Sequence, residues 1–156
     1  MFFSRARAAV VGWTIINSVP FLNLSRRPER WPTLAELDGY PEGSLGRAVA
    51  AFLRERGLPF KVRYENHDAI HTILGYDTSD RGEMELQAFL WGNDASSFAG
   101  HILFVWGGLM QPEQWSAMRR ALHRGRAAAP IEEARLPHRL YEPLAAVRRE
   151  LERHAA

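Results

Sequence analysis

The chain contains no cysteine and a single lysine, and the missing thiols limit its chemistry most. Without thiols it forms no disulfide, and it offers neither a thiolate metal ligand nor a cysteine nucleophile. That composition fits a reducing compartment. Any bound metal must therefore be held by histidine, aspartate, glutamate or backbone oxygen atoms.

Arginine carries nearly all of the positive charge, because Lys61 is the only lysine among 20 basic residues. The formal net charge is +2, and the acidic residues are interspersed with the arginines. No dense basic run with interleaved aromatic residues occurs, although such a run is typical of nucleic-acid-binding proteins. We therefore expect no nucleic-acid partner.

Long apolar segments are also scarce. The first 22 residues, "MFFSRARAAVVGWTIINSVPFL", predict a helix over residues 4–18, but polar residues and Pro20 end the apolar run before it reaches spanning length. This helix is either mostly buried or lies on a membrane surface, with its arginines at the headgroups. Trp13 and Trp31 are candidate interfacial anchors. The apolar run 101–110 is too short to span a bilayer.

Helical patterns dominate the rest of the chain, and no segment shows the alternation of a sheet. The length favours one domain, residues 1–156. We predict an all-α protein, a compact bundle of about six to seven helices. The further helices are expected over residues 44–57, 67–74, 82–92, 95–110, 112–128 and 137–154, with one short helix over 33–38 in the connection before them. Residues 58–66 are the one segment that could be extended.

Several helix ends carry recognisable signals. Ser44 is a candidate N-cap, Gly57 a candidate C-cap residue, and Asp80 a candidate cap for the helix over 82–92. Two helices carry an apolar stripe that predicts a buried face. The stripes are Leu45, Val49, Phe52 and Leu53 in one helix, and Leu140, Leu144, Val147 and Leu151 in the last.

The stretch "HDAIHTILGYDTSDRGE" carries the strongest chemical signal. Residues four apart stack on one face of a helix, so His67 and His71 would project side by side and could hold one ion. Asp68 could bind the same ion or orient an imidazole from behind. The turn that follows has a glycine at each end and lets the chain fold back, which would bring Glu83 to the histidines.

Two imidazoles with one or two carboxylates leave coordination positions open, as in a catalytic zinc site or a two-histidine, one-carboxylate iron site. On spacing alone, a solvated or capping polar face of the helix remains an alternative. Phosphohydrolases with an "HD" pair need an earlier histidine ligand, whereas His67 is the first histidine of this chain. Zincin proteases carry glutamate where Asp68 stands, so they too are disfavoured.

The same residues resemble a known family. "HDAIHTILGYDTSDRGEMELQAF" resembles the H-D-x-x-H-x11-E signature of the ubiquinone (coenzyme Q) biosynthesis family commonly called Coq four. Upstream, "YPEGSLGRAVAAFLRERG" is similar to that family's P-x-G-(T/S)-x-G-R-x-(Y/V) stretch. Together the two segments cover roughly residues 41–90.

The resemblance implies an all-α protein with a divalent metal, most often taken as zinc, held by His67, Asp68, His71 and Glu83. It also implies a homodimer, an isoprenoid lipid or prenylated quinone precursor as ligand, other quinone-biosynthesis enzymes as partners, and peripheral contact with a membrane. The chain is shorter than eukaryotic members and shows no convincing transit peptide. We therefore expect a bacterial protein of the cytoplasm or the inner-membrane surface.

Two functions follow from these expectations. In the first, the same four residues act catalytically on the head group of a prenylated benzoate-type precursor, in an oxidative decarboxylation and hydroxylation at its carbon 1. Zinc has no redox chemistry, so iron, cobalt or an external oxidant would be needed. In the second, the protein is a non-catalytic isoprenoid-binding scaffold around a bound metal. A helical domain with a fortuitous polar cluster is a third hypothesis.

Other polar and aromatic residues have less specific roles. His101 reads as a core histidine, and Arg47 and Arg81 could meet a phosphate or carboxylate of a ligand. Aromatic residues at helical spacing could line a lipid cavity or simply fill the core. They are Phe89, Trp91, Phe98, Phe104 and Trp106.

Overall fold

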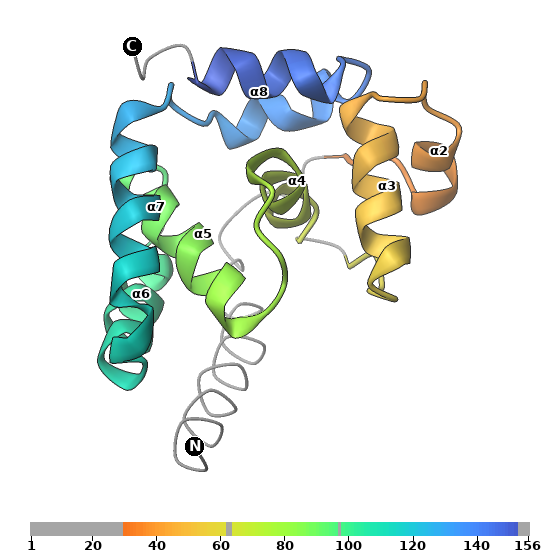
Figure 1. The fold of residues 1–156 in the computed structure, drawn as a ribbon. Helices are drawn as coiled ribbons and strands as arrows, with labels where there is room; N and C mark the ends of the chain where they lie inside the picture. The colour runs from red at the N-terminus through yellow and green to blue at the C-terminus, as the bar shows by residue number, and fades with distance from the viewer. Residues whose placement is uncertain (1–29, 62–63, 97, 153–156) are drawn as a thin grey trace. The chain divides into compact units, whose positions relative to one another are not determined.

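The computed structural model describes residues 30–61, 64–96 and 98–152, and these ranges form helices joined by loops (Figure 1). The α-helices are α2 (Leu34–Asp38), α3 (Leu45–Glu55), α4 (Glu65–Leu74), α5 (Asp80–Gly92), α6 (Phe98–Met110), α7 (Trp115–Ala127) and α8 (Leu144–Glu152), with 3-10 helices η1 (Pro112–Gln114) and η2 (Glu133–Arg139). The described ranges contain no strand, and Ser44 and Pro143 form an isolated bridge. The all-α prediction is confirmed, with seven α-helices in these ranges.

Backbone contacts divide the chain into two compact units. Among the described residues, the first unit is Tyr76–Pro130, with α5, α6, η1 and α7. The second unit contains residues 30–75 and 131–152, with α2, α3, α4, η2 and α8. The helix expected over 4–18, with Trp13, lies outside the described residues, and a single domain over 1–156 stays a prediction. None of the described helices is long and apolar enough to cross a membrane.

In the second unit, the start of α3 is tied to the segment that precedes α8. Ser44 caps α3 as predicted. The N–H groups of Leu45 and Gly46 donate to the carbonyl oxygens of Glu142 and Leu140, both at 2.8 Å. The first N–H groups of a helix have no partner within it, so these bonds satisfy donors that would otherwise need water.

Gly46 is required at this junction. A Cβ atom there would lie 2.3 Å from the ring of Tyr40 and 3.1 Å from the carbonyl oxygen of Leu140. Gly46 therefore allows α3 to lie against the backbone of the C-terminal segment. Further along α3, the predicted apolar face is buried, as expected. It consists of Leu45, Val49, Phe52 and Leu53.

The last helix differs from its prediction. The apolar stripe suggested one helix over 137–154, but Pro143 divides the segment, and α8 begins at Leu144. Proline has no N–H for an intrahelical bond, and its ring clashes with the preceding turn. Val147 and Leu151 are still buried, whereas Leu144 is half-buried.

Two glycines allow α5 and α7 of the first unit to cross closely. A Cβ on Gly92 would lie 2.1 Å from the carbonyl oxygen of Leu122, and one on Gly125 would lie 2.1 Å from that of Phe89. The side chain of Asn93 donates to the carbonyl oxygen of Gly125 at 3.0 Å. The backbones of α5 and α7 are therefore in direct contact, and a buried hydrogen bond stabilises this contact.

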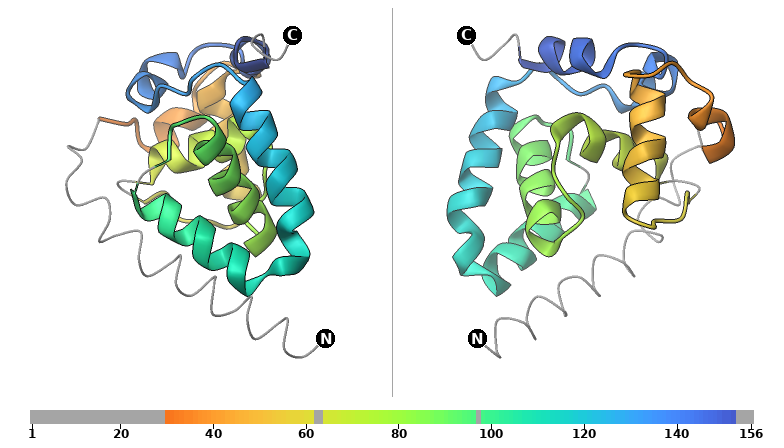
Figure 2. Two further views of the ribbon diagram at one scale, coloured as in Figure 1. Left: turned by 90° about the vertical axis from the view of Figure 1, so that its left-hand side faces the viewer. Right: turned by 45° about the vertical axis from the view of Figure 1, so that its right-hand side comes forward.

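The connection from α6 to α7 runs through η1, as Figure 2 shows. The expected helix over 112–128 therefore begins with a 3-10 turn, in which Pro112 takes the favoured first-turn position. Helix α6 begins at Phe98, later than the expected residue 95. Asp94, just after α5, has a positive φ of 56° and ends the preceding helical turn.

The substitution Gly125→Ala should lower the free energy of unfolding by about 1–3 kcal/mol, because the added methyl meets rigid backbone. Gly108→Ala is the matched control. There the nearest atom, Met118 Cε at 3.3 Å, ends a flexible side chain, and alanine gains helix propensity. Urea unfolding followed by circular dichroism compares the two. Equal losses in both variants would contradict this account of the crossing.

Candidate metal centre

Helix α4 presents His67 and His71 on one face, one turn apart. Their ring centroids are 4.5 Å apart, with the planes at 68°. His71 is fully buried, and the side chain of His67 is 28% exposed. The helix begins at Glu65, two residues before the prediction, and ends at Gly75, whose φ of 76° is a left-handed C-cap. The predicted side-by-side placement of the two imidazoles is confirmed.

Aromatic rings pack against both histidines. The ring of Phe52, from α3, stacks on His71 with a centroid distance of 5.9 Å. The ring of Tyr64 meets His67 edge-on at 6.2 Å. These contacts restrict the rotamers of the imidazoles, so their nitrogen atoms are held in place before any ligand binds.

Arg148 of α8 fixes the C-terminal end of α4. Its Nε donates to the carbonyl oxygen of Ile73 at 2.9 Å, and a terminal nitrogen donates to that of Thr72 at 2.8 Å. The last carbonyl groups of a helix have no partner within it, and a positive charge there is favourable for the helix dipole. One guanidinium therefore anchors the helix that carries both histidines.

The N-terminus of α5 is capped by Ser79, and the sequence-based choice of Asp80 was wrong. The hydroxyl oxygen of Ser79 accepts from the N–H of Gly82 at 3.2 Å. Asp77 fixes this turn, because its Oδ1 accepts from the N–H of Ser79 at 3.0 Å and from its hydroxyl. Asp80 therefore becomes the first residue of the helix rather than its cap.

The absence of a side chain at Gly82 allows the first turn of α5, which carries Glu83, to pack against Asp77. A Cβ on Gly82 would lie 2.1 Å from the carbonyl oxygen of Asp77 and 2.3 Å from its Oδ1. Glu83 consequently lies in the first turn of α5, close to Asp80. Burial, and after it the charge of Glu83, raises the pKa of the Asp80 carboxyl. The first turn of α5 therefore holds two acidic side chains close together.

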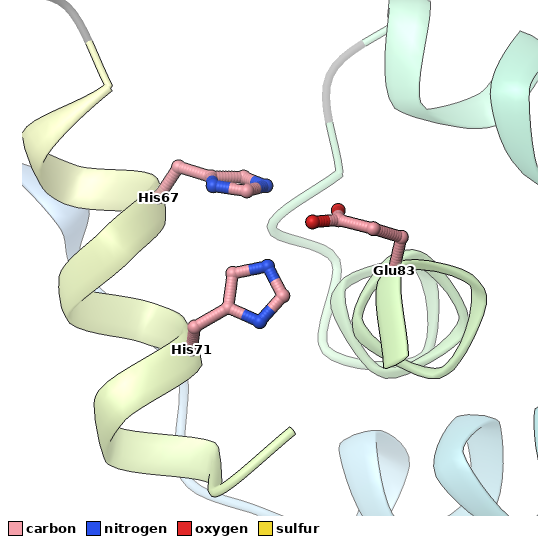
Figure 3. A group of neighbouring side chains, drawn as sticks. All are labelled: His67, His71 and Glu83. Atoms are coloured by element: carbon pink, nitrogen blue, oxygen red, sulfur yellow. The ribbon is translucent and has the colours of Figure 1, made fainter. Parts of the chain in front are cut away.

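Figure 3 shows the side chains of His67, His71 and Glu83 directed toward one another. One nitrogen of each histidine and one carboxylate oxygen lie within 4.8 Å of one another. Ligands at about 2.0–2.2 Å from one ion are at most about 4.4 Å apart. Two imidazoles with one carboxylate are a donor set that suits a divalent metal.

Asp68 does not join this group of three. Its Oδ1 lies 3.6 Å from Nδ1 of His67, and its side chain is largely buried. That position suits a carboxylate that orients an imidazole from behind. Direct ligation by Asp68 stays a prediction.

The two arginines considered as ligand-binding residues contact acidic groups of the chain itself. Arg47 lies 3.6 Å from Asp38. Nε of Arg81 lies 3.2 Å from Oε1 of Glu85, one turn further along α5. Trp31, expected as a membrane anchor, donates from its indole to Oδ1 of Asn66 at 3.1 Å.

The aromatic residues of α5 and α6 have mixed surroundings. Phe89 is fully buried, and Trp91 packs against His101 and Phe104 with centroid distances of 4.4 Å and 4.7 Å. Trp106 is 39% exposed, and the side chain of Phe98 lies outside the described set. A lipid cavity lined by these rings stays a prediction.

No protein-family model and no curated protein matches the chain. Among solved structures, a proposed ubiquinone biosynthesis protein from Nostoc punctiforme PCC 73102 is similar, with a TM-score of 0.68. The superposition covers 96% of this chain and 81% of that chain, at 19% sequence identity. At this identity the likeness shows a shared fold.

Removing the guanidinium at position 148 should loosen α4. Arg148→Met should lower the free energy of unfolding by about 1.5–3 kcal/mol, since two charge-assisted hydrogen bonds are lost. It should also speed amide hydrogen exchange in α4. Arg149→Met, at the exposed next position of α8, is the control. Identical stability and exchange in the two variants would refute the anchoring role.

Proposed function

We propose that His67, His71 and Glu83 hold one divalent metal ion, with zinc the first candidate and iron or cobalt the alternatives. The observation that carries this proposal is the grouping of the three donor atoms within 4.8 Å. Two imidazoles and one carboxylate leave coordination positions for a substrate oxygen or water.

We further propose that the chain serves ubiquinone biosynthesis, acting on the head group of a prenylated quinone precursor. Two independent features support this role. The backbone resembles that of the Nostoc protein over 96% of the chain. The residues of "YPEGSLGR" and "HDAIHTILGYDTSDRGE" resemble the signature stretches of the Coq four family.

The proposed reaction replaces the carboxylate at carbon 1 of the precursor with a hydroxyl group and releases carbon dioxide. When bound, the metal would supply a Lewis acid for the negative charge that develops on the substrate. His67, His71 and Glu83 would hold it, and Asp68, 3.6 Å from Nδ1 of His67, would orient that imidazole. In this exchange water would supply the hydroxyl oxygen, and the two electrons released would reduce an external oxidant, such as dioxygen to hydrogen peroxide.

A non-catalytic scaffold is the second candidate. The complete burial of His71 favours it, because a metal beside a fully buried ligand suits a stabilising role. In this case the protein would hold an isoprenoid lipid and present it to other quinone-biosynthesis enzymes, as a homodimer. Both candidates require the same metal ligands, and they differ in whether turnover occurs.

Metal content tests the shared requirement. Elemental analysis after gentle purification should find about one metal ion per chain in the wild type and a loss of at least tenfold in His71→Ala and Glu83→Ala. His123→Ala, at an exposed position of α7, should keep the metal. Asp68→Asn should weaken affinity by about 10–100-fold if Asp68 orients His67. Full metal content in His71→Ala would contradict the proposed ligand set.

Turnover separates the two candidates. Metal-loaded protein would receive a C1-carboxylated prenylated hydroxybenzoate under air, and the decarboxylated, hydroxylated product would be followed by mass spectrometry. The enzymatic role predicts product with wild type and His123→Ala, and none with His71→Ala. Equal turnover by wild type and His71→Ala would remove the enzymatic role. A copurified isoprenoid without any turnover would establish the scaffold instead.

A further inference from the structure

Helix α6 carries an apolar stripe that faces solvent. Its members recur at helical spacing and therefore share one face. They are Ile102, Val105, Trp106 and Leu109, which are 54%, 49%, 39% and 69% exposed. Among the described residues, these four are most of the large hydrophobic side chains that are exposed. Such a concentration marks an interaction surface rather than scattered surface residues.

Trp115 extends this stripe from α6 onto α7. It is 55% exposed, and its indole Nε1 donates to the carbonyl oxygen of Gly108 at 2.6 Å. The ring therefore lies against the C-terminal end of α6 at Gly108. The two helices are joined here by η1 (Figure 2), so exposed apolar side chains stand on both helices near this junction.

Two exposed arginines lie on the same side of α7 as Trp115. Arg119 and Arg126 follow Trp115 by four and eleven residues, which places all three on one side of the helix. Both arginines are exposed. From Phe98 to Ala127 the sequence contains four arginines and one acidic residue, Glu113. Helix α6 therefore carries no Asp, Glu, Lys or Arg, and α7, which follows it, is cationic.

We propose that this face, the α6–α7 face, docks on the surface of an anionic phospholipid bilayer. It comprises Ile102, Val105, Trp106, Leu109, Trp115, Arg119 and Arg126. The aliphatic side chains would enter the region between headgroups and acyl chains, where tryptophan is also favoured. The arginines would then lie at the level of the lipid phosphates and be attracted by their charge.

The charge pattern favours a bilayer over a second copy of the chain. In a two-fold symmetric dimer the same patch meets itself, so the arginines of the two copies would be brought together. An anionic membrane instead neutralises them. The proposal is independent of the metal site, because every residue that it uses lies on α6 or α7.

The test is cosedimentation of the full chain with vesicles of phosphatidylcholine, with and without phosphatidylglycerol. Binding should require the anionic lipid and should weaken with salt. Leu109→Glu and the double variant Arg119→Glu/Arg126→Glu should each weaken binding by about tenfold. The controls are Tyr141→Glu for the apolar-to-acidic change and the double variant Arg135→Glu/Arg149→Glu for the charge change, all at exposed positions of the second unit. Both controls should bind as the wild type does.

Circular dichroism and metal content of each variant show that the fold and the metal site are intact. The proposal is overturned if the wild type ignores anionic vesicles, or if the controls lose as much binding as Leu109→Glu. It is also overturned if Leu109→Glu converts a dimer to a monomer in light scattering while vesicle binding is unchanged. That result would assign the face to a second copy.

Discussion

The histidine pair depends on the anchoring of α4. A helix of ten residues is marginal by itself in water, so its geometry must be fixed by the surrounding structure. Phe52 packs against His71 from one side, Gly75 turns the chain away, and Arg148 binds the last carbonyl groups. If this anchoring failed, His67 and His71 would no longer share a face, and the proposed ligand set would lose two of its three members.

Local signals explain which parts of this structure were predictable. Ser44 and Gly75 act within a few residues of their own helix ends, and the spacing of His67 and His71 follows from helical geometry alone. Pro143 signals the break before α8, but the apolar stripe continues across it and by itself predicts one longer helix. At the start of α5, Ser79 and Asp80 are both residues that favour the N-cap position. Hydrogen bonds from Ser79 to the side chain of Asp77 place Ser79 there.

Long-range contacts left no such signal. Arg148 binds carbonyl groups more than seventy residues earlier in the chain, and nothing in its own neighbourhood distinguishes it from Arg149. Position 125 likewise needs a glycine only because the backbone of Phe89 packs against it in the folded chain, and the sequence does not show that contact. The apolar stripe of α6 was readable as hydrophobic, but the sequence could not tell whether it faced the core or the solvent.

The central claim is that one divalent ion binds to His67, His71 and Glu83, and X-ray absorption spectroscopy of the zinc-loaded chain tests it most directly. The account predicts two imidazole nitrogen donors at about 2.0–2.1 Å together with oxygen donors. In His71→Ala loaded with excess zinc, one imidazole contribution should disappear. A coordination shell of oxygen atoms alone, or an identical spectrum for the variant, would contradict the claim.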